Sequence, residues 1–205
     1  MDWYEEEVRA IERAPGGCTP GAVIFYGSSS FRLWTTLAED LAPWPIINRA
    51  FGGSTLAACV HFFERLVVPC APRSLVCYAG DNDLGDGQSP AAVLDSFRAL
   101  LTKVDRCIGS IPLAVLSIKP SPARWHLREQ IGSVNTAMRG MLAERARSIY
   151  IDVATPMLGH VGTPRLELYA ADGLHLSQAG YRLWTRIIAA YGDDLLPAEL
   201  HSTTI

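Results

Sequence analysis

This sequence of 205 residues lacks three features, and each absence excludes a class of protein. No window approaches the ~18–20 uninterrupted apolar residues that a membrane-spanning helix needs, so we expect no membrane span. No excess of positive charge is present, because the net charge is −3 at pH 7, and nucleic-acid binding is therefore not expected. The N-terminus is acidic and no apolar stretch follows it, unlike a signal peptide, which predicts a cytoplasmic protein.

Cysteines are also few, and their arrangement is not that of a disulfide framework or a zinc site. Their number is odd, their spacing is irregular and no Cys-x-x-Cys pair occurs. Several lie inside apolar stretches, which suits buried thiols. We therefore predict that all five are reduced, namely Cys18, Cys59, Cys70, Cys77 and Cys107.

What the sequence does contain is a globular balance of residues, 49% hydrophobic and 19% charged. The length suits one domain with a substantial core. We therefore predict a single domain over residues 1–205, with a helical lead-in over 1–20 and a C-terminal tail over 193–205. The apolar content is compatible with a homo-oligomer, but nothing in the sequence fixes the oligomeric state.

Short apolar runs alternate with segments of helical period along most of the chain. The apolar runs predict strands at 22–26, 45–49, 74–78, 113–118 and 149–152. The periodic segments predict helices at 2–13, 30–41, 56–67, 90–107, 125–147 and 177–191. This alternation predicts an α/β fold, a three-layer α/β/α sandwich with a five-stranded parallel sheet. Ligands of such sheets bind at the carboxyl ends of the strands.

The first predicted strand is followed by a cluster of serines, Ser28, Ser29 and Ser30. Any of them could simply cap the next helix, or one could be a nucleophile whose oxyanion is held by free backbone amides. Near the other end of the chain, Asp172 precedes His175 by three residues. That carboxylate can orient the imidazole while the other ring nitrogen accepts a serine proton. Together these are the parts of a serine esterase.

The loops after the second and third predicted strands supply candidate donors to an oxyanion. Gly53 either makes a tight turn or offers a backbone amide that a substrate can approach. Asn82 either caps a turn or donates its side-chain amide without carrying charge. The acids near it, Asp81, Asp83 and Asp86, lack a histidine partner and calcium-loop spacing, so we expect no metal.

Taken in order, these segments resemble the SGNH hydrolases, also called the GDSL family. That family carries Gly-Asp-Ser after the first strand, a glycine after the second, Gly-x-Asn-Asp after the third and Asp-x-x-His near the end. The corresponding segments here are Gly27-Ser28-Ser29, Gly53, Gly80-Asp81-Asn82-Asp83 and Asp172-Gly173-Leu174-His175. The resemblance spans residues 22–190 and implies the flavodoxin-like sandwich of that family.

One departure from the family pattern is Ser28, which stands where the family has aspartate. Gly-Ser-Ser-Ser, together with the Lys-Pro-Ser-Pro segment at 119–122 and Trp125, resembles one subgroup of the family. That subgroup is similar to platelet-activating-factor acetylhydrolases and bacterial acetylesterases. The resemblance therefore implies a small-molecule ester as substrate, with a short acyl group such as acetyl.

The resemblance also implies a role for each site residue. Ser29 would be the nucleophile, with Ser28 and Ser30 as rivals, His175 the general base and acid, and Asp172 its partner. The oxyanion hole would consist of the Ser29 amide, the Gly53 amide and the Asn82 side chain, with no cofactor or metal. Candidate substrate contacts, each of which could instead belong to the core, are Phe31, Trp34, Phe51, Leu84, Trp125 and Leu174.

Other functions fit parts of the same pattern. Lipase, thioesterase or acyltransferase activity would use the same scaffold, and no motif separates them. A non-catalytic binding module could keep the fold, but the complete set of serine, histidine, aspartate and asparagine argues against it. A nucleotide-binding protein ranks last, because the sequence has neither Gly-x-Gly-x-x-Gly nor a P-loop.

Overall fold

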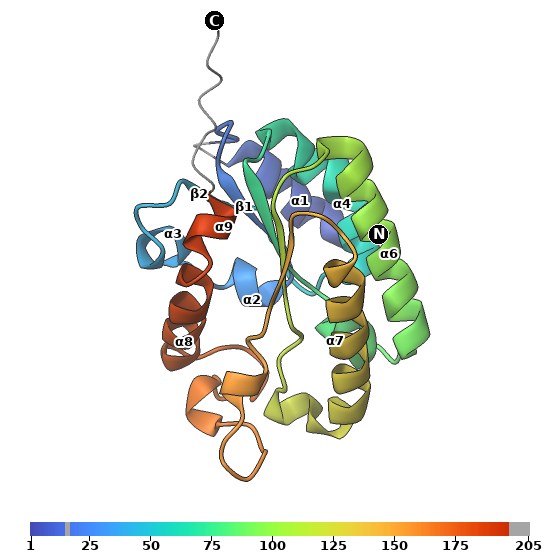
Figure 1. Cartoon of the computed structure of the whole chain (residues 1–205), viewed down its shortest axis with the longest axis vertical. Coiled ribbons are helices and arrows are strands. Elements are labelled where there is room, and N and C mark those ends of the chain that lie inside the picture. Colours follow the sequence, from blue (N-terminus) through green and yellow to red (C-terminus); the bar gives the residue numbers. More distant parts are fainter. Residues whose placement is uncertain (15–16, 197–205) are drawn as a thin grey trace, which may run out of the picture.

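The computed structural model of the chain describes residues 1–14 and 17–196. Five parallel strands form one sheet in the order β2-β1-β3-β4-β5. They are β1 (Val23–Gly27), β2 (Ile46–Asn48), β3 (Ser74–Tyr78), β4 (Leu113–Leu116) and β5 (Ser148–Ile151). Because all five run the same way, their carboxyl ends meet at one edge of the sheet, the lower edge in Figure 1.

Helices cover both faces of this sheet (Figure 1). One face carries α1 (Glu5–Arg13), α4 (Leu56–Leu66), α6 (Pro90–Ile108) and α7 (Arg128–Ala143). The other carries α2 (Ser29–Arg32), α3 (Leu37–Asp40), α8 (Gln178–Ala189) and α9 (Gly192–Leu195). A short α5 (Asp81–Gly85) follows β3. Short 3₁₀ helices are η1 (Asp2–Tyr4), η2 (Val68–Cys70), η3 (Pro122–Leu127), η4 (Thr155–Met157) and η5 (Leu166–Leu168). The predicted three-layer sandwich is confirmed.

The sheet separates two hydrophobic cores. Successive side chains of a strand point to opposite faces, so Ile24 and Tyr26 pack under α4 and α6, whereas Val23 and Phe25 pack toward α2 and α8. All five residues of β1 and of β3 are buried. Both strands are therefore held on two sides, which fixes the position of the loops that leave their carboxyl ends.

Two predicted helices are wrong in extent. The helix predicted at 30–41 is broken into α2 and α3, because Trp34 is buried in the core and its indole N–H donates to Asp40 at 2.6 Å. The helix predicted at 125–147 is shorter, since η3 precedes α7 and Arg147 adopts a positive φ of 57°. The short α5 was not predicted. Of the predicted tail at 193–205, residues 197–205 lie outside the described residues, as does His201.

The prediction of five reduced cysteines is also wrong, because Cys18 and Cys70 form a disulfide with their Cα atoms 4.3 Å apart. These residues lie in the segments that lead into β1 and β3, which are neighbours in the sheet although the two cysteines are 52 residues apart. Cys59, Cys77 and Cys107 are free thiols. Burial raises the pKa of Cys59 to about 12, which keeps it protonated and unreactive.

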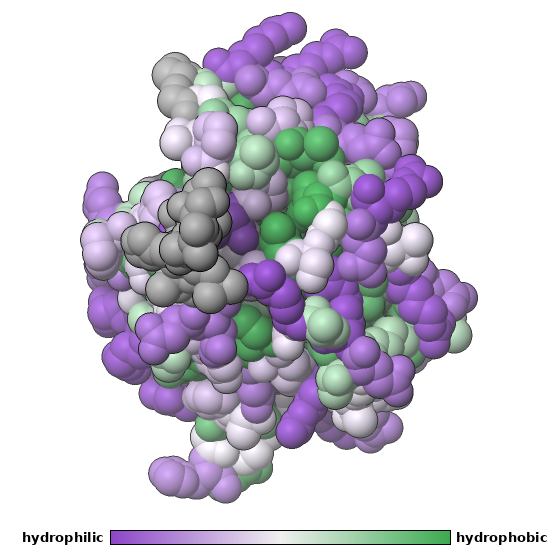
Figure 2. Space-filling model, turned by 45° about the horizontal axis from the view of Figure 1, so that its top comes forward, coloured by the Kyte–Doolittle hydropathy of each residue, from purple (hydrophilic) through white to green (hydrophobic). Residues whose placement is uncertain are grey.

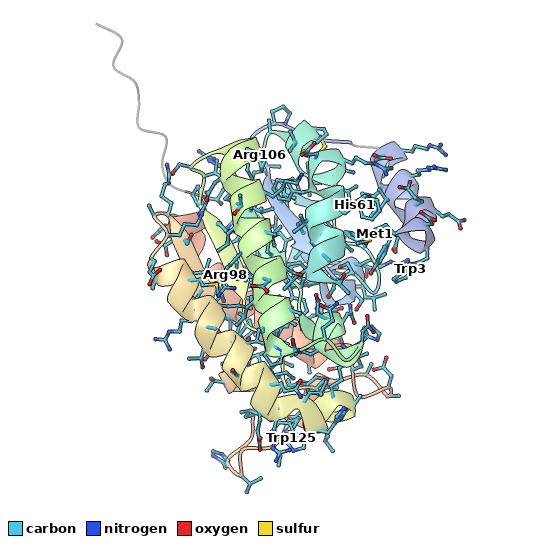
Figure 3. All side chains as sticks on the ribbon, turned by 90° about the vertical axis from the view of Figure 1, so that its right-hand side faces the viewer. Met1, Trp3, His61, Arg98, Arg106 and Trp125 are labelled. Atoms are coloured by element: carbon cyan, nitrogen blue, oxygen red, sulfur yellow. A yellow bond between two sulfur atoms is a disulfide. The ribbon has the colours of Figure 1, made fainter. Side chains whose placement is uncertain are left out.

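Figure 2 shows the molecule with the amino-terminal edge of the sheet turned toward the viewer. On this face, hydrophilic side chains surround a small hydrophobic patch. Among residues 1–14 and 17–196, no helix is long and apolar enough to cross a membrane. Trp3 lies beside Met1 and His61, whereas Trp125 lies at the end of the molecule where the strands finish (Figure 3).

Candidate active site

Ser29 is the first residue of α2, directly after β1. The approach of β1 to β3 requires glycine at position 27, because its φ is +138° and a Cβ there would lie 1.9 Å from the Tyr78 carbonyl oxygen. The backbone N–H of Ser28 then donates to that same carbonyl at 2.9 Å. Ser28 and Ser30 are buried, at 2% and 1% exposure, whereas Ser29 is only partly buried. Of the three serines, Ser29 thus has the most accessible side chain.

His175 lies between Ser29 and Asp172. Its Nε2 is 3.1 Å from Ser29 Oγ, and its Nδ1 is 2.6 Å from Asp172 Oδ2. Asp172 Oδ1 also accepts the backbone N–H groups of Leu174 and His175, each at 2.9 Å. The hydrogen bond from His175, with these two amides, lowers the pKa of Asp172 to about 2. An ionised Asp172 fixes the proton on Nδ1, so that Nε2 is free to accept the serine proton.

The other described histidines do not share this arrangement. His61 is exposed on α4, where its ring packs on the edge of Phe62 at 4.6 Å, and His126 and His160 are exposed on η3 and in a loop. The serine loop and the histidine loop, 146 residues apart in the sequence, meet where His175 contacts Ser29.

Backbone and side-chain N–H groups surround the same place. The backbone N–H groups of Ser29 and Gly53 donate to no residue that the structure describes. Asn82 lies on α5, half-buried, and donates one N–H to the Ser54 carbonyl at 3.1 Å. Because a carboxamide has two N–H donors, the second one remains free. Donors of this kind can hold a developing oxyanion.

The helical lead-in contributes contacts that sequence reasoning missed. Gly53 has a φ of +64°, and a Cβ there would lie 2.7 Å from the ring of Trp3, which is 68% exposed. The Tyr4 hydroxyl donates to the Gly53 carbonyl at 3.1 Å, and Glu7 accepts the Gly52 N–H at 2.8 Å. The periodicity of 2–13 predicts a helix but does not show on which loop that helix packs.

A buried ionic cluster under Asn82 was missed as well. Asp81 is almost fully buried and lies 2.6 Å from Lys119 Nζ and 2.7 Å from Arg124 Nη1. Burial by itself raises the pKa of Asp81, but the charges of Lys119 and Arg124 outweigh it and hold that pKa below its ordinary value. Arg124 Nη2 also donates to Asn82 Oδ1 at 3.2 Å. The Lys-Pro-Ser-Pro segment was the available signal for this cluster.

The neighbouring acid Asp83 caps α4 instead. Both its oxygens accept the Leu56 N–H at 3.0 Å, and the side chain is fully buried. Burial raises the pKa of Asp83 to about 6. Within the described part of the chain, no group of three or more His, Cys, Asp or Glu side chains could hold a metal ion.

The predicted substrate contacts differ in burial. Four of the six are buried in the two cores, and they are Phe31, Trp34, Phe51 and Leu84. Trp34 also lines a groove of about 470 Å³ together with Asp40 and Tyr181. Leu174 and Trp125 remain partly exposed. Trp125 lines a groove of about 460 Å³ between α7 and the segment at 152–162.

The fold, together with a serine, a histidine and an aspartate joined in this way, is typical of serine hydrolases built on a three-layer sandwich. The model of the GDSL-like lipase/acylhydrolase family matches residues 17–183. The chain belongs to that family and is an ester-hydrolysing enzyme. No curated protein matches the sequence.

Solved structures with the same fold include three from bacteria. A Streptococcus pneumonia protein provisionally described as a platelet activating factor is 21% identical, with a TM-score of 0.79 over 93% of this chain and 94% of that one. A GDSL-like lipase from Bacteroides thetaiotaomicron is 20% identical, with a TM-score of 0.74 over 92% and 95%. A family 3 carbohydrate esterase from Clostridium thermocellum is 17% identical, with a TM-score of 0.67 over 87% and 98%.

Proposed function

We propose that this enzyme hydrolyses carboxylic esters by two-step acyl transfer through Ser29, His175 and Asp172. The observation that carries the proposal is the continuous chain of contacts from Ser29 Oγ to His175 Nε2 at 3.1 Å, and from His175 Nδ1 to Asp172 Oδ2 at 2.6 Å. Its order matches the requirement that the base touch the nucleophile and be oriented by a third group.

In the first step His175 accepts the proton of Ser29 as the serine oxygen attacks the ester carbonyl carbon. Asp172 stays ionised and stabilises the imidazolium that forms. The tetrahedral intermediate collapses when His175 gives its proton to the leaving alcohol, and an acyl-Ser29 ester remains. Water activated by His175 then releases the acid and restores Ser29.

The negative oxygen of each intermediate would accept the N–H groups of Ser29, Gly53 and Asn82. Support comes from the two backbone N–H groups that donate to no described residue and from the free N–H of Asn82. Asn82→Ala is expected to lower kcat by about 10²–10³, as loss of one such donor does elsewhere.

The acyl group we propose is short, acetyl being the first choice. The resemblance to the subgroup with a Gly-Ser-Ser-Ser opening supports this choice. Phe31, Phe51 and Leu84, three of the predicted substrate contacts, are buried and offer almost no exposed surface to a long acyl chain. We also propose that the enzyme acts in the cytoplasm. The Cys18–Cys70 disulfide is the observation against this location, because disulfides are rare in reducing compartments.

The test is hydrolysis of p-nitrophenyl acetate, butyrate and octanoate by the wild type, Ser29→Ala and His175→Ala, with a chelator present. We expect wild-type activity that is greatest on acetate and falls by at least about 10³ in both variants. Ser28→Ala and Ser30→Ala serve as matched controls, because each removes a hydroxyl of the same cluster. Full activity of Ser29→Ala would refute the assignment of the nucleophile.

A further inference from the structure

Arg124 lies between a buried acid and the amide of Asn82. Its Nη1 is 2.7 Å from Asp81 Oδ1, and its Nη2 donates to Asn82 Oδ1 at 3.2 Å. The side chain is only 17% exposed. The contact of Nη1 is an ion pair without a hydrogen bond, so the hydrogen bond from Nη2 to Asn82 is the directional contact of this planar guanidinium.

Neutralising Asp81 does not require Arg124. Lys119 is fully buried and lies 2.6 Å from Asp81 Oδ2, which already pairs the acid. Arg124 therefore adds a second positive charge to a pair that is complete without it. Besides its ion pair with Asp81, the Arg124 guanidinium has one hydrogen-bond acceptor among the described side chains, Asn82 Oδ1.

The contact to Asn82 decides which end of its carboxamide faces the site. One N–H of Asn82 donates to the Ser54 carbonyl at 3.1 Å, while Oδ1 accepts from Arg124. A half-turn of the amide would place Oδ1 against that carbonyl and the NH₂ group against the guanidinium, and both contacts would be repulsive. The observed orientation alone leaves an N–H directed away from these two partners.

We propose that Arg124 is a positioning residue of the oxyanion hole, which keeps the Asn82 amide in its donor orientation. A cationic donor on Oδ1 also polarises the amide, and hydrogen bonds in such a chain strengthen one another. The inference rests on the proposed function, because it requires that Asn82 donate to the oxyanion. This role belongs to the segment between β4 and α7, which carries Arg124 on η3.

Gly85 provides a way to move the guanidinium without removing it. A Cβ on Gly85 would lie 2.5 Å from Arg124 Cζ and Nε. The glycine ends α5 without a positive φ, so alanine suits its backbone. The methyl group of Gly85→Ala would push the end of the Arg124 side chain from Asn82 while keeping its charge.

The experiment measures kcat and KM on p-nitrophenyl acetate for Asn82→Ala, Arg124→Met and the double variant. We expect Arg124→Met to lower kcat about tenfold with little change in KM, and the double variant to be no slower than Asn82→Ala. An independent, multiplicative loss in the double variant would overturn the inference. So would a rise in KM at unchanged kcat, which would indicate a substrate contact.

Two further variants test the inference in case Arg124→Met does not fold. Gly85→Ala should lower kcat in the wild-type background and leave kcat unchanged in the Asn82→Ala background. Unchanged kcat of Gly85→Ala in the wild-type background would overturn the inference. Arg106→Met, on the exposed end of α6 away from Trp125, is the control and should match the wild type (Figure 3). Full activity of Asn82→Ala would refute the proposed oxyanion hole and with it the role of Arg124. Unchanged kcat in Arg124→Met and Gly85→Ala, with a slow Asn82→Ala, would refute the role of Arg124 and leave the proposed function intact.

Discussion

Asp172 and Asp83 are two carboxylates of the same site region, and their surroundings shift their pKa values in opposite directions. Asp172 is half-exposed and accepts three hydrogen bonds, which lower its pKa to about 2. Asp83 is fully buried against the start of α4, and burial raises its pKa to about 6. The accessible acid, Asp172, contacts the histidine and stays ionised, whereas the buried acid, Asp83, accepts a backbone N–H at the start of α4 and stabilises the fold.

The largest expected effect is on catalysis at Asp172. Asp172→Asn keeps the shape of the side chain but no longer fixes the proton on His175 Nδ1, so kcat should fall by about 10⁴. The free energy of unfolding at neutral pH should change little, because the side chain is half-exposed. Ester hydrolysis and urea unfolding of the same preparation measure both quantities. Asp152→Asn is a control, since Asp152 caps a turn after β5.

A smaller effect is expected on stability at Asp83. Its native pKa of about 6 lies above the ordinary value of 3.8, so the native state binds the proton more tightly than the unfolded state. The stabilisation is complete below about pH 4 and is lost as the pH rises through 6, by up to about 3 kcal/mol. Asp83→Asn should remove this dependence.

Urea unfolding between pH 3 and 8 tests the sign of this dependence, with Asp95→Asn, an exposed carboxylate on α6, as the matched control. Asp172 should contribute in the opposite direction but only slightly, because its side chain is half-exposed: its lowered pKa favours the fold above pH 4, and this small contribution is lost as the pH falls toward 2. A stability that rises with pH from 4 to 6 in the wild type, and equally in Asp83→Asn, would contradict the comparison.

The smallest expected effect is at Trp3, which stands over Gly53 from the helical lead-in. Trp3→Ala removes an exposed ring beside a proposed oxyanion donor, so we expect KM to rise a few-fold, more for butyrate than for acetate, with kcat nearly unchanged. Val161→Ala, an even more exposed apolar residue in another loop, is the control. Equal effects of the two substitutions would show that Trp3 has no specific contact with substrate.

Much of this fold was readable from the sequence, because buried parallel strands leave short apolar runs separated by helical periods. All five strands lie within a few residues of their predicted bounds. The helix at 30–41 was misjudged because a tertiary contact, the burial of Trp34, overrode local propensity. The Cys18–Cys70 disulfide was missed because only sheet order brings the two leading segments together.

The candidate site was readable to the extent that its residues lie in short motifs. Ser29, Asn82, Asp172 and His175 each follow a recognisable local pattern, and the structure brings Ser29, His175 and Asp172 into contact. The supporting contacts from Trp3, Glu7 and Arg124 come from segments far away in the sequence. The local sequence of a helix or of a proline-rich loop does not indicate which residues, distant in the sequence, that segment will contact.

Ser29 is the residue that we propose to carry the acyl group. A fluorophosphonate reagent reacts covalently with an activated serine, so incubation with this reagent followed by peptide mass mapping identifies the nucleophile. We expect one adduct, on Ser29, formed by the wild type and lost in His175→Ala. An adduct on Ser28 or Ser30, or full esterase activity in enzyme whose Ser29 is fully labelled, would refute this role of Ser29.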